Sequence, residues 1–402
     1  MTEAAMKPLE RSVSRSLELS GKALLDFNLV TVHMELLQLY ISATDSTSAW
    51  NRLAGVVEQL SANQNRWRKV SFDIPGHELY LHPHELTSLE DIYLKCGNLH
   101  NLRNETIEPS TSFPCLRRVK TSMAFDLEFA DEHTLASVRQ LETLDMSHVD
   151  YIGDPCAGSD ISDTHLSSPI IVRPNLLRVR FKAELPGIFD ENPSPPYTCH
   201  FFRTYTCPAI TSLALSNCDV ELLQLVHDFL GRGSPSLSSL SLQLMNVMTL
   251  DMDSRDYPTE KQLQNDVIIT CLRKCPALRF LFIHNSRYEI GQGLPVKSEL
   301  WVALSERSGQ TMALVPKLEK LTLRDSMARD GGFKELISVR WNATESSLRC
   351  IELKNCVEYF DSNGSVPLHR GWLKSESWKE VVAYINEGLN LSLIVNLGTG
   401  LV

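Results

Sequence analysis

The stretch LEKLTLRDS, from Leu318 to Ser326, decides the fold of this chain. Its apolar residues Leu318, Leu321 and Leu323 stand three and then two positions apart. The last two alternate with polar residues, as in a short strand that buries one face, and the first closes the preceding turn. The same L-x-x-L-x-L pattern recurs along the chain. Further clear copies begin at Leu89, Leu141, Leu176, Ile210, Leu237, Leu278 and Leu348; a copy at Trp67 also fits, and a weaker copy begins at Leu116.

The distances between these copies indicate a repeat protein with insertions. The first positions of successive copies lie 22 to 41 residues apart. Most of these distances are at or above the period of about 20 to 29 residues that is typical of leucine-rich repeats. Helices can form between the strands. Asp219 is expected to cap a helix that ends at Gly231 or Gly233, and Thr259 precedes a second helix that ends before Pro276.

These features predict an α/β leucine-rich-repeat solenoid, a curved horseshoe with a parallel concave sheet and with helices and loops on the convex side. An ordinary parallel-sheet protein with leucine-rich strands is the alternative. Residues 1–64 are expected to form an N-terminal strand and helical segment, and residues 65–402 the solenoid, in one continuous domain with that segment. The loops Gly153–Pro169 and Leu185–Thr198 concentrate residues that break periodic structure, so both are interpreted as insertions.

Residues with small or amide side chains follow several of the predicted strands. In a leucine-rich repeat, such a turn residue satisfies backbone groups where the chain leaves the strand. The residues at this place are Cys96, Asn217 with Cys218, Asn285, Ser326, and Asn355 with Cys356.

The composition is that of a globular protein, with 43% hydrophobic and 22% charged residues. A net charge of −10 argues against general binding to nucleic acid or to anionic membranes. The first twelve residues lack the apolar stretch of a secretory signal, and no segment reaches the roughly 18 apolar residues of a membrane span. We therefore expect a cytoplasmic or nuclear protein whose ten cysteines are reduced thiols.

Motifs for catalysis, cofactor binding or metal binding are scarce, so the chain is not expected to be an enzyme or to hold a cofactor. His77, His82 and His84 lie together, but their spacing is not H-E-x-x-H, and a loop with solvated histidines is the better interpretation. Cys271 and Cys275 are one helical turn apart. Core packing is favoured for them over a metal or redox pair, because cysteine behaves as a small hydrophobic residue.

Several segments outside the generic repeat add a more particular resemblance. In order along the chain, these segments are LERSVSRSLELS (Leu9–Ser20), VVEQLSANQNRWRKVSF (Val56–Phe72), SELWVALSERSGQTMALVPKLEKLTL (Ser298–Leu323), FKELISVRWN (Phe333–Asn342), SLRCIELKNC (Ser347–Cys356) and VVAYINEGLNLSLIV (Val381–Val395). Their order resembles that of the basidiomycete fungal F-box proteins with leucine-rich repeats. In that family, a strand like the first segment follows the F-box, and a helix and a second strand come next.

Members of this family act as substrate receptors of Skp/cullin/F-box ubiquitin ligases in ubiquitin-dependent protein degradation. Their F-box holds the Skp adaptor and their repeats hold the protein to be ubiquitinated. In this chain, no F-box start of the LPxEILxxIF kind precedes Leu9. The resemblance thus implies Skp-type adaptor and cullin partners only if an upstream F-box exists; otherwise the repeat module lacks the adaptor contact. An interaction scaffold unconnected to ubiquitination is the runner-up, and an enzyme built on the two inserted loops is the third possibility.

The strand positions between the buried ones predict the surface that would face a partner. Over ten repeat copies, these outward positions carry ten basic and four acidic residues, a net charge of +6, so the rest of the chain carries −16. This segregation favours an acidic or phosphorylated protein partner. The candidate binding residues are Arg118, Lys120, Arg178, Arg180, Lys182, Phe280, Phe282, Lys320 and Arg324. The alternative is that the charges only solvate strand edges and that a loop or the C-terminal segment covers both phenylalanines.

Overall fold

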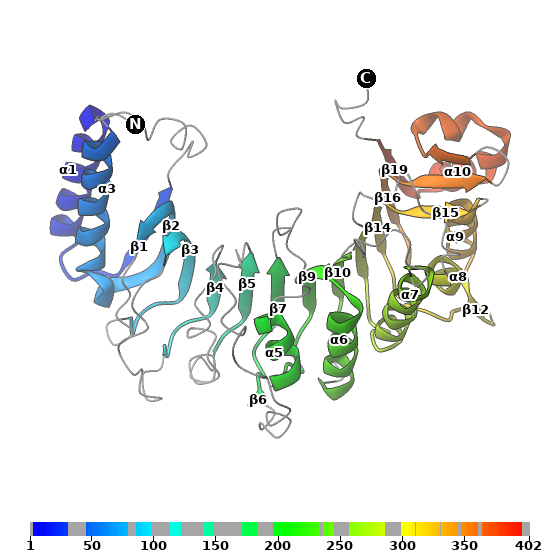
Figure 1. The fold of residues 1–402 in the computed structure, drawn as a ribbon, viewed down its shortest axis with the longest axis horizontal. Helices are drawn as coiled ribbons and strands as arrows, with labels where there is room; N and C mark the ends of the chain where they lie inside the picture. Colours follow the sequence, from blue (N-terminus) through cyan, green and yellow to red (C-terminus); the bar gives the residue numbers. More distant parts are fainter. Residues whose placement is uncertain are drawn as a thin grey trace. The chain divides into compact units, whose positions relative to one another are not determined.

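A computed structural model (Figure 1) describes most of the chain and divides it into two compact units. The first unit comprises Met1–His165 with Lys182–Pro186, and the second comprises Leu166–Phe181 with Gly187–Val402. The described residues are 3–30, 46–78, 86–98, 113–121, 140–147, 171–182, 196–233, 236–244, 257–285, 299–309, 311–329, 331–343, 347–360 and 364–395. This division does not test the expectation that residues 1–64 and the solenoid of residues 65–402 form one continuous domain, which stays a prediction.

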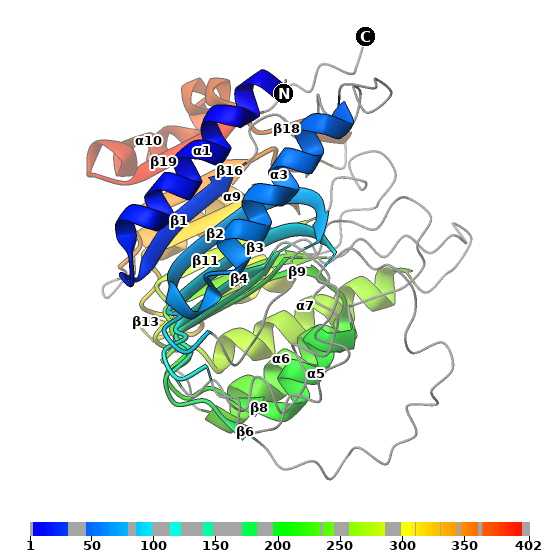
Figure 2. The same cartoon turned by 90° about the vertical axis from the view of Figure 1, so that its left-hand side faces the viewer.

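The described part of the first unit contains two α-helices and five parallel strands. Its elements are α1 (Glu3–Ser20), β1 (Leu25–Val30), α3 (Ser46–Ser61), the short 3-10 helix η1 (Gln64–Arg66), β2 (Trp67–Glu78), β3 (Asp91–Asn98), β4 (Arg118–Thr121) and β5 (Thr143–Ser147). The strands pair in the order β1-β2-β3-β4-β5. The helices α1 and α3 pack side by side (Figure 2). Phe27 of β1 packs edge-on against Trp67 and Phe72 of β2, with ring centroids 5.6 and 5.2 Å away.

Among the described residues of the second unit, seven parallel strands of one sheet pair in the order β7-β9-β10-β11-β14-β16-β19. These strands are β7 (Arg178–Lys182), β9 (Ser212–Cys218), β10 (Ser239–Leu244), β11 (Phe280–His284), β14 (Lys320–Arg324), β16 (Cys350–Lys354) and β19 (Asn390–Ile394). Shorter strands lie outside this sheet: β6 (Ile171–Val172) pairs with β8 (Tyr205–Thr206), β12 (Arg307–Ser308) with β13 (Thr311–Met312), and β17 (Val357–Phe360) with both β15 (Met327–Arg329) and β18 (Gly364–Pro367).

Helices connect successive strands of the second unit and stack against one another. They are α5 (Pro196–Thr204), α6 (Val220–Gly233), α7 (Tyr257–Arg273), α8 (Glu299–Ser305), α9 (Gly332–Trp341) and α10 (Lys379–Asn386), the last preceded by the 3-10 helices η5 (Arg370–Lys374) and η6 (Glu376–Trp378). Each helix from α5 to α9 packs on the next (Figure 1). The core lies between the sheet and these helices, where the repeat leucines are buried.

The repeat pattern explains this arrangement residue by residue. In the copy that begins at Leu278, the three apolar positions Leu278, Leu281 and Ile283 are at most 1% exposed. Phe280 and Phe282 between them lie on the opposite face of β11, because side chains alternate along a strand. Neighbouring copies pair without a shift, so each buried position lies beside a buried position of the next strand. The predicted mixed α/β class with parallel strands is confirmed.

The two helices predicted between strands are both present. Asp219 caps α6, since its Oδ1 accepts a hydrogen bond of 2.7 Å from the backbone N–H of Leu222. The helix ends at Gly233, which is one of the two expected ends. The second helix, α7, begins at Tyr257, so Thr259 lies in its first turn instead of preceding it.

The structure of the N-terminal segment differs from what the resemblance implies. Leu9–Ser20, where the resemblance implies a strand, belongs to helix α1. The physical reason is contact with α3: Ser14 Oγ donates to Gln59 Oε1 at 2.7 Å, and Arg52 forms an ion pair of 2.9 Å with Glu10. The first described strand follows at Leu25–Val30.

Both inserted loops fall largely outside the described residues. This holds for all of Gly153–Pro169 and for Leu185–Thr198 up to residue 195, after which the chain enters α5. An enzyme site built on these loops is therefore not tested. No described helix is long and apolar enough to cross a membrane.

Candidate binding surface

The exposed sheet face of the second unit arranges its side chains in rows that cross the strands. The first row consists of Arg178, Ser212, Ser239, Phe280, Lys320, Cys350 and Asn390. The second row consists of Arg180, Ala214, Ser241, Phe282, Thr322, Glu352 and Ser392. A third row places Gln243, His284, Arg324, Lys354 and Ile394 side by side. The structure thus brings together, on one face, the predicted candidates Arg178, Arg180, Phe280, Phe282, Lys320 and Arg324.

The β7 strand of this face is basic. Arg178 and Arg180 are both exposed, and in the described part of the chain Arg178 forms no ion pair. Next to them, β9 and β10 present only Ser212, Ala214, Ser239 and Ser241 in the first two rows. Lys182 is the last residue of β7, but its side chain lies outside the described part.

The aromatic pair lies three strands away from the arginines, on β11. Phe280 is 40% exposed, which is unusual for a phenylalanine, and Phe282 is half-buried. The guanidinium of Arg279 lies 5.4 Å from the Phe280 ring, while its nitrogens hold Glu319 at 2.7 and 2.8 Å. Because Phe280 is this exposed, no described segment covers it.

The charges on β14 and β16 compensate one another. Glu352 lies 3.3 Å from Lys320 Nζ and 3.7 Å from Lys354 Nζ, and it accepts a hydrogen bond of 3.1 Å from Thr322. Burial acts to raise the pKa of Glu352, but the Thr322 hydrogen bond and the two lysines outweigh it, so the pKa is lower than usual. The carboxylate is therefore charged at neutral pH. Glu352 therefore compensates the charge of Lys320 locally, which the count of outward charges does not show.

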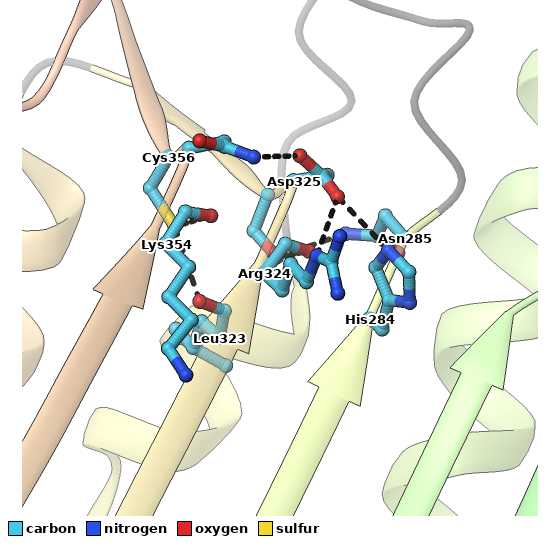
Figure 3. Close-up of polar contacts among 9 residues, drawn as sticks. His284, Asn285, Leu323, Arg324, Asp325, Lys354 and Cys356 are labelled. Atoms are coloured by element: carbon cyan, nitrogen blue, oxygen red, sulfur yellow. Dashed lines mark hydrogen bonds and ion pairs between the residues drawn. The ribbon is translucent and has the colours of Figure 1, made fainter. Parts of the chain in front are cut away.

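A second polar cluster lies where β11, β14 and β16 end (Figure 3). The Asp325 side chain is 1% exposed, and its Oδ2 lies 2.9 Å from His284 Nε2 and 3.2 Å from Arg324 Nε. Its Oδ1 accepts a hydrogen bond of 2.9 Å from Asn355 Nδ2. Burial acts to raise the pKa of Asp325, and these hydrogen bonds and charges reverse that effect, so its pKa lies below the usual value. Arg324, a predicted binding residue, therefore contacts a carboxylate of its own chain.

Asp325, which lies at the centre of this cluster, is not among the binding residues predicted from the sequence. It occupies the turn position that carries Asn217 in one copy and Asn355 in another, and all three have a positive φ, between 49° and 54°. Asparagine and aspartate adopt this left-handed conformation more readily than other non-glycine residues. The sequence signal that could have identified it is an acidic residue at a turn position where two other copies carry asparagine.

In the first unit, the predicted binding residues also have partners. Arg118 forms an ion pair of 3.2 Å with Asp91 of the neighbouring strand. The Lys120 ammonium lies 4.6 Å from the centroid of the Tyr93 ring. Neither residue lies in the second unit with Arg178 and Phe280. We therefore centre the candidate surface on β7 to β11 of the second unit.

The motifs considered for metal binding are resolved only in part. Cys271 and Cys275 are 1% and 0% exposed, and Cys271 Sγ donates to the Leu223 carbonyl at 3.5 Å. Burial raises the pKa of Cys275 to about 12, so its thiol stays neutral. His77 is near the end of β2, whereas His82 and His84 lie outside the described residues. Within the described ranges, no three His, Cys, Asp or Glu side chains gather in a way that could hold a metal ion.

A scan against models of known protein families finds no match for this chain, and a search of curated proteins finds no similar sequence. The resemblance to fungal F-box proteins therefore stays a prediction.

Proposed function

We propose that this chain is a protein-binding leucine-rich-repeat module that holds an acidic or phosphorylated segment of another protein on the exposed sheet face of its second unit. The observation that carries the proposal is the register of β7 to β11. It aligns Arg178 and Arg180 with Phe280 and Phe282 in two successive rows, so one face offers both cationic and aromatic contacts. Arginine binds carboxylates and phosphates with two parallel hydrogen bonds, and exposed aromatic side chains are common interface anchors.

The proposal extends to the ubiquitin system through the resemblance. We propose that the module corresponds to the substrate-recognition part of a Skp/cullin/F-box receptor. What supports this is the order of the segments that resemble the fungal family, together with a strand for each clear repeat copy. A scaffold without a ligase connection would show the same exposed face, so an experiment must separate the two functions.

Binding of purified protein to fluorescent peptides tests the first part of the proposal. We expect an acidic or phosphorylated peptide to bind more tightly than a basic peptide of equal length, with affinity that falls as salt concentration rises. Reversing the charge of Arg178 and Arg180 to Glu should remove this binding. The control reverses Arg273 and Lys274, which are exposed at the end of α7, and changes the net charge equally. If both double variants lose binding to the same extent, only the net charge matters and the proposed surface is refuted.

Co-purification tests the second part. Recovery of the Skp adaptor and a cullin, with this chain or with an N-terminally extended chain, supports the receptor function. Recovery of neither, with both chains, contradicts the receptor function and favours the scaffold. The peptide experiment does not depend on this result, so the two parts of the proposal fail or succeed separately.

A further inference from the structure

The face from β7 to β11 has a period that selects the pattern of its ligand. Residues two apart on a strand face the same side and lie about 6.6 to 6.8 Å apart. Arg178 and Arg180 therefore form one line of cationic groups along β7, and Phe280 and Phe282 form a line of aromatic groups along β11. The two lines are parallel, because β7, β9, β10 and β11 all pair in parallel.

The distance between the two lines suits one extended peptide. Neighbouring strands lie about 4.8 Å apart, so three strand spacings separate the Cα atoms of the two lines by about 14 Å. The strands between them carry two serines in the first row and an alanine and a serine in the second, and these side chains rise little above the sheet. A peptide in an extended conformation points its side chains alternately to either side of its backbone, with the same repeat of about 6.6 to 6.8 Å.

We infer that the surface binds an extended peptide that runs along β9 and β10 and alternates anionic with apolar side chains. This inference rests on the proposed function. The anionic side chains at positions i and i+2 face Arg178 and Arg180, and the apolar side chains at i+1 and i+3 face Phe280 and Phe282. Carboxylates and phosphoserines provide the same anionic chemistry. Charge complementarity selects this partner, since Arg178 has no ion pair among the described residues and no described segment covers Phe280.

A peptide that crossed the strands would follow a different pattern. At about 3.4 Å per residue, the 14 Å between the lines corresponds to four residues, so an anionic residue would stand four positions from an apolar one. The register of the rows allows both directions in principle. A peptide that runs along the strands can contact both residues of each line, whereas a crossing peptide reaches one arginine and one phenylalanine.

Three peptides of identical composition distinguish these outcomes. One alternates Glu with Leu, one places Glu and Leu four positions apart, and one groups all Glu before all Leu; a second set replaces Glu by phosphoserine. We expect the alternating peptide to bind at least about tenfold more tightly than the other two, measured by fluorescence anisotropy. Equal or tighter binding of either rearranged peptide overturns the alternation but leaves the proposed function standing. Absence of binding by all six peptides overturns both.

Double-mutant cycles then test the pairing of particular residues. Phe280→Ala should weaken binding of the alternating peptide about tenfold and should have little effect on binding of a peptide whose Leu residues are already Ala. Arg178→Gln should likewise lose its effect when the peptide Glu residues are Gln. The matched control is Val302→Ala. Val302 is 71% exposed on α8, so this substitution also removes an exposed apolar group, but away from the proposed surface. Additive effects in both cycles, or an equal effect of the control, would contradict the inferred pairing.

Discussion

Arg340 of helix α9 provides the sharpest test of how the second unit is held together. The residue is 1% exposed, and its guanidinium donates to the carbonyls of Leu304 at 2.7 Å, Val315 at 3.1 Å and Leu314 at 2.7 Å. Leu304 lies in the last turn of α8, where carbonyls have no partner within the helix. Val315 has a positive φ of 43° in the turn before β14. One side chain thus ties α8 and α9 to the turn that precedes β14.

The expected cost of removing this group follows from two opposing effects. Three hydrogen bonds from a charged donor contribute about 1.5 to 3 kcal/mol each, or about 5 to 9 kcal/mol together. Burial lowers the pKa of Arg340 to about 10, and this desolvation offsets about 3 kcal/mol of that gain. Arg340→Met, which keeps an unbranched stem, should therefore reduce the free energy of unfolding by about 2 to 6 kcal/mol. The guanidinium still carries its charge at neutral pH.

Urea unfolding followed by tryptophan fluorescence measures this loss, because Trp301 is 5% exposed and lies on α8 with Leu304. Arg340→Lys should lie between the parent protein and Arg340→Met, since an ammonium cannot reproduce the planar fork of donors. The control is Arg279→Met, which removes an exposed ion pair with Glu319 and should cost much less than Arg340→Met, because solvent screens exposed charges. A loss for Arg340→Met no larger than that of the control would refute the reasoning.

Three further predictions concern single groups. Asp325→Asn should destabilise the protein by about 1 to 3 kcal/mol at pH 7. Because the folded-state pKa of Asp325 is lowered, its contribution is complete above the unfolded pKa and is lost as pH falls below about 4, so acid unfolding of the variant should show a shallower loss in that window. Asp219→Ala should cost about 1 kcal/mol, measured by thermal unfolding, through loss of the cap of α6; an unchanged melting temperature would contradict the role of the cap. A thiol reagent at neutral pH should label the half-buried Cys115 and Cys350 before Cys275, as mass spectrometry can show, and early labelling of Cys275 would contradict its place in the core.

Much of the sheet was predictable because strand periodicity and repeat spacing constrain each other. The copies at Leu237, Leu278, Leu318 and Leu348 have the same internal spacing, and their strands pair without a shift in register. Once the apolar positions are assigned to the core, the side chains between them must lie on the other face. The outward positions could therefore be read directly from the sequence.

Two described strands that pair with repeat strands, β1 and β19, lack the pattern for local reasons. In β19, Leu391 and Leu393 follow the repeat, but Gly388 stands at the position that Leu348 occupies in the copy before it. That glycine has a φ of +113°, which an apolar side chain rarely adopts. In β1, a register shift between Leu25 and Asp26 removes one position from the spacing. A search for L-x-x-L-x-L cannot find either strand.

The charge of the surface was harder to predict, because it depends on pairs between neighbouring copies. Lys320 and Glu352 are 32 residues apart in sequence and 3.3 Å apart in space. A count of outward residues adds them to opposite totals, although together they present little net charge to a ligand. The same holds for Arg324, whose counter-charge Asp325 lies beyond the last outward position and was not counted.

These pairs change where a ligand should bind. A charged partner of the β14 and β16 region would compete with Glu352 for Lys320 and with Asp325 for Arg324, so part of any new attraction is offset by the contacts that it replaces. Arg178 has no such contact to lose among the described residues. A polyanion attracted only by net charge would make no such distinction. The contrast therefore predicts that charge reversal at Arg178 weakens binding of an anionic peptide more than charge reversal at Lys320 does, although the sequence made both residues equal candidates.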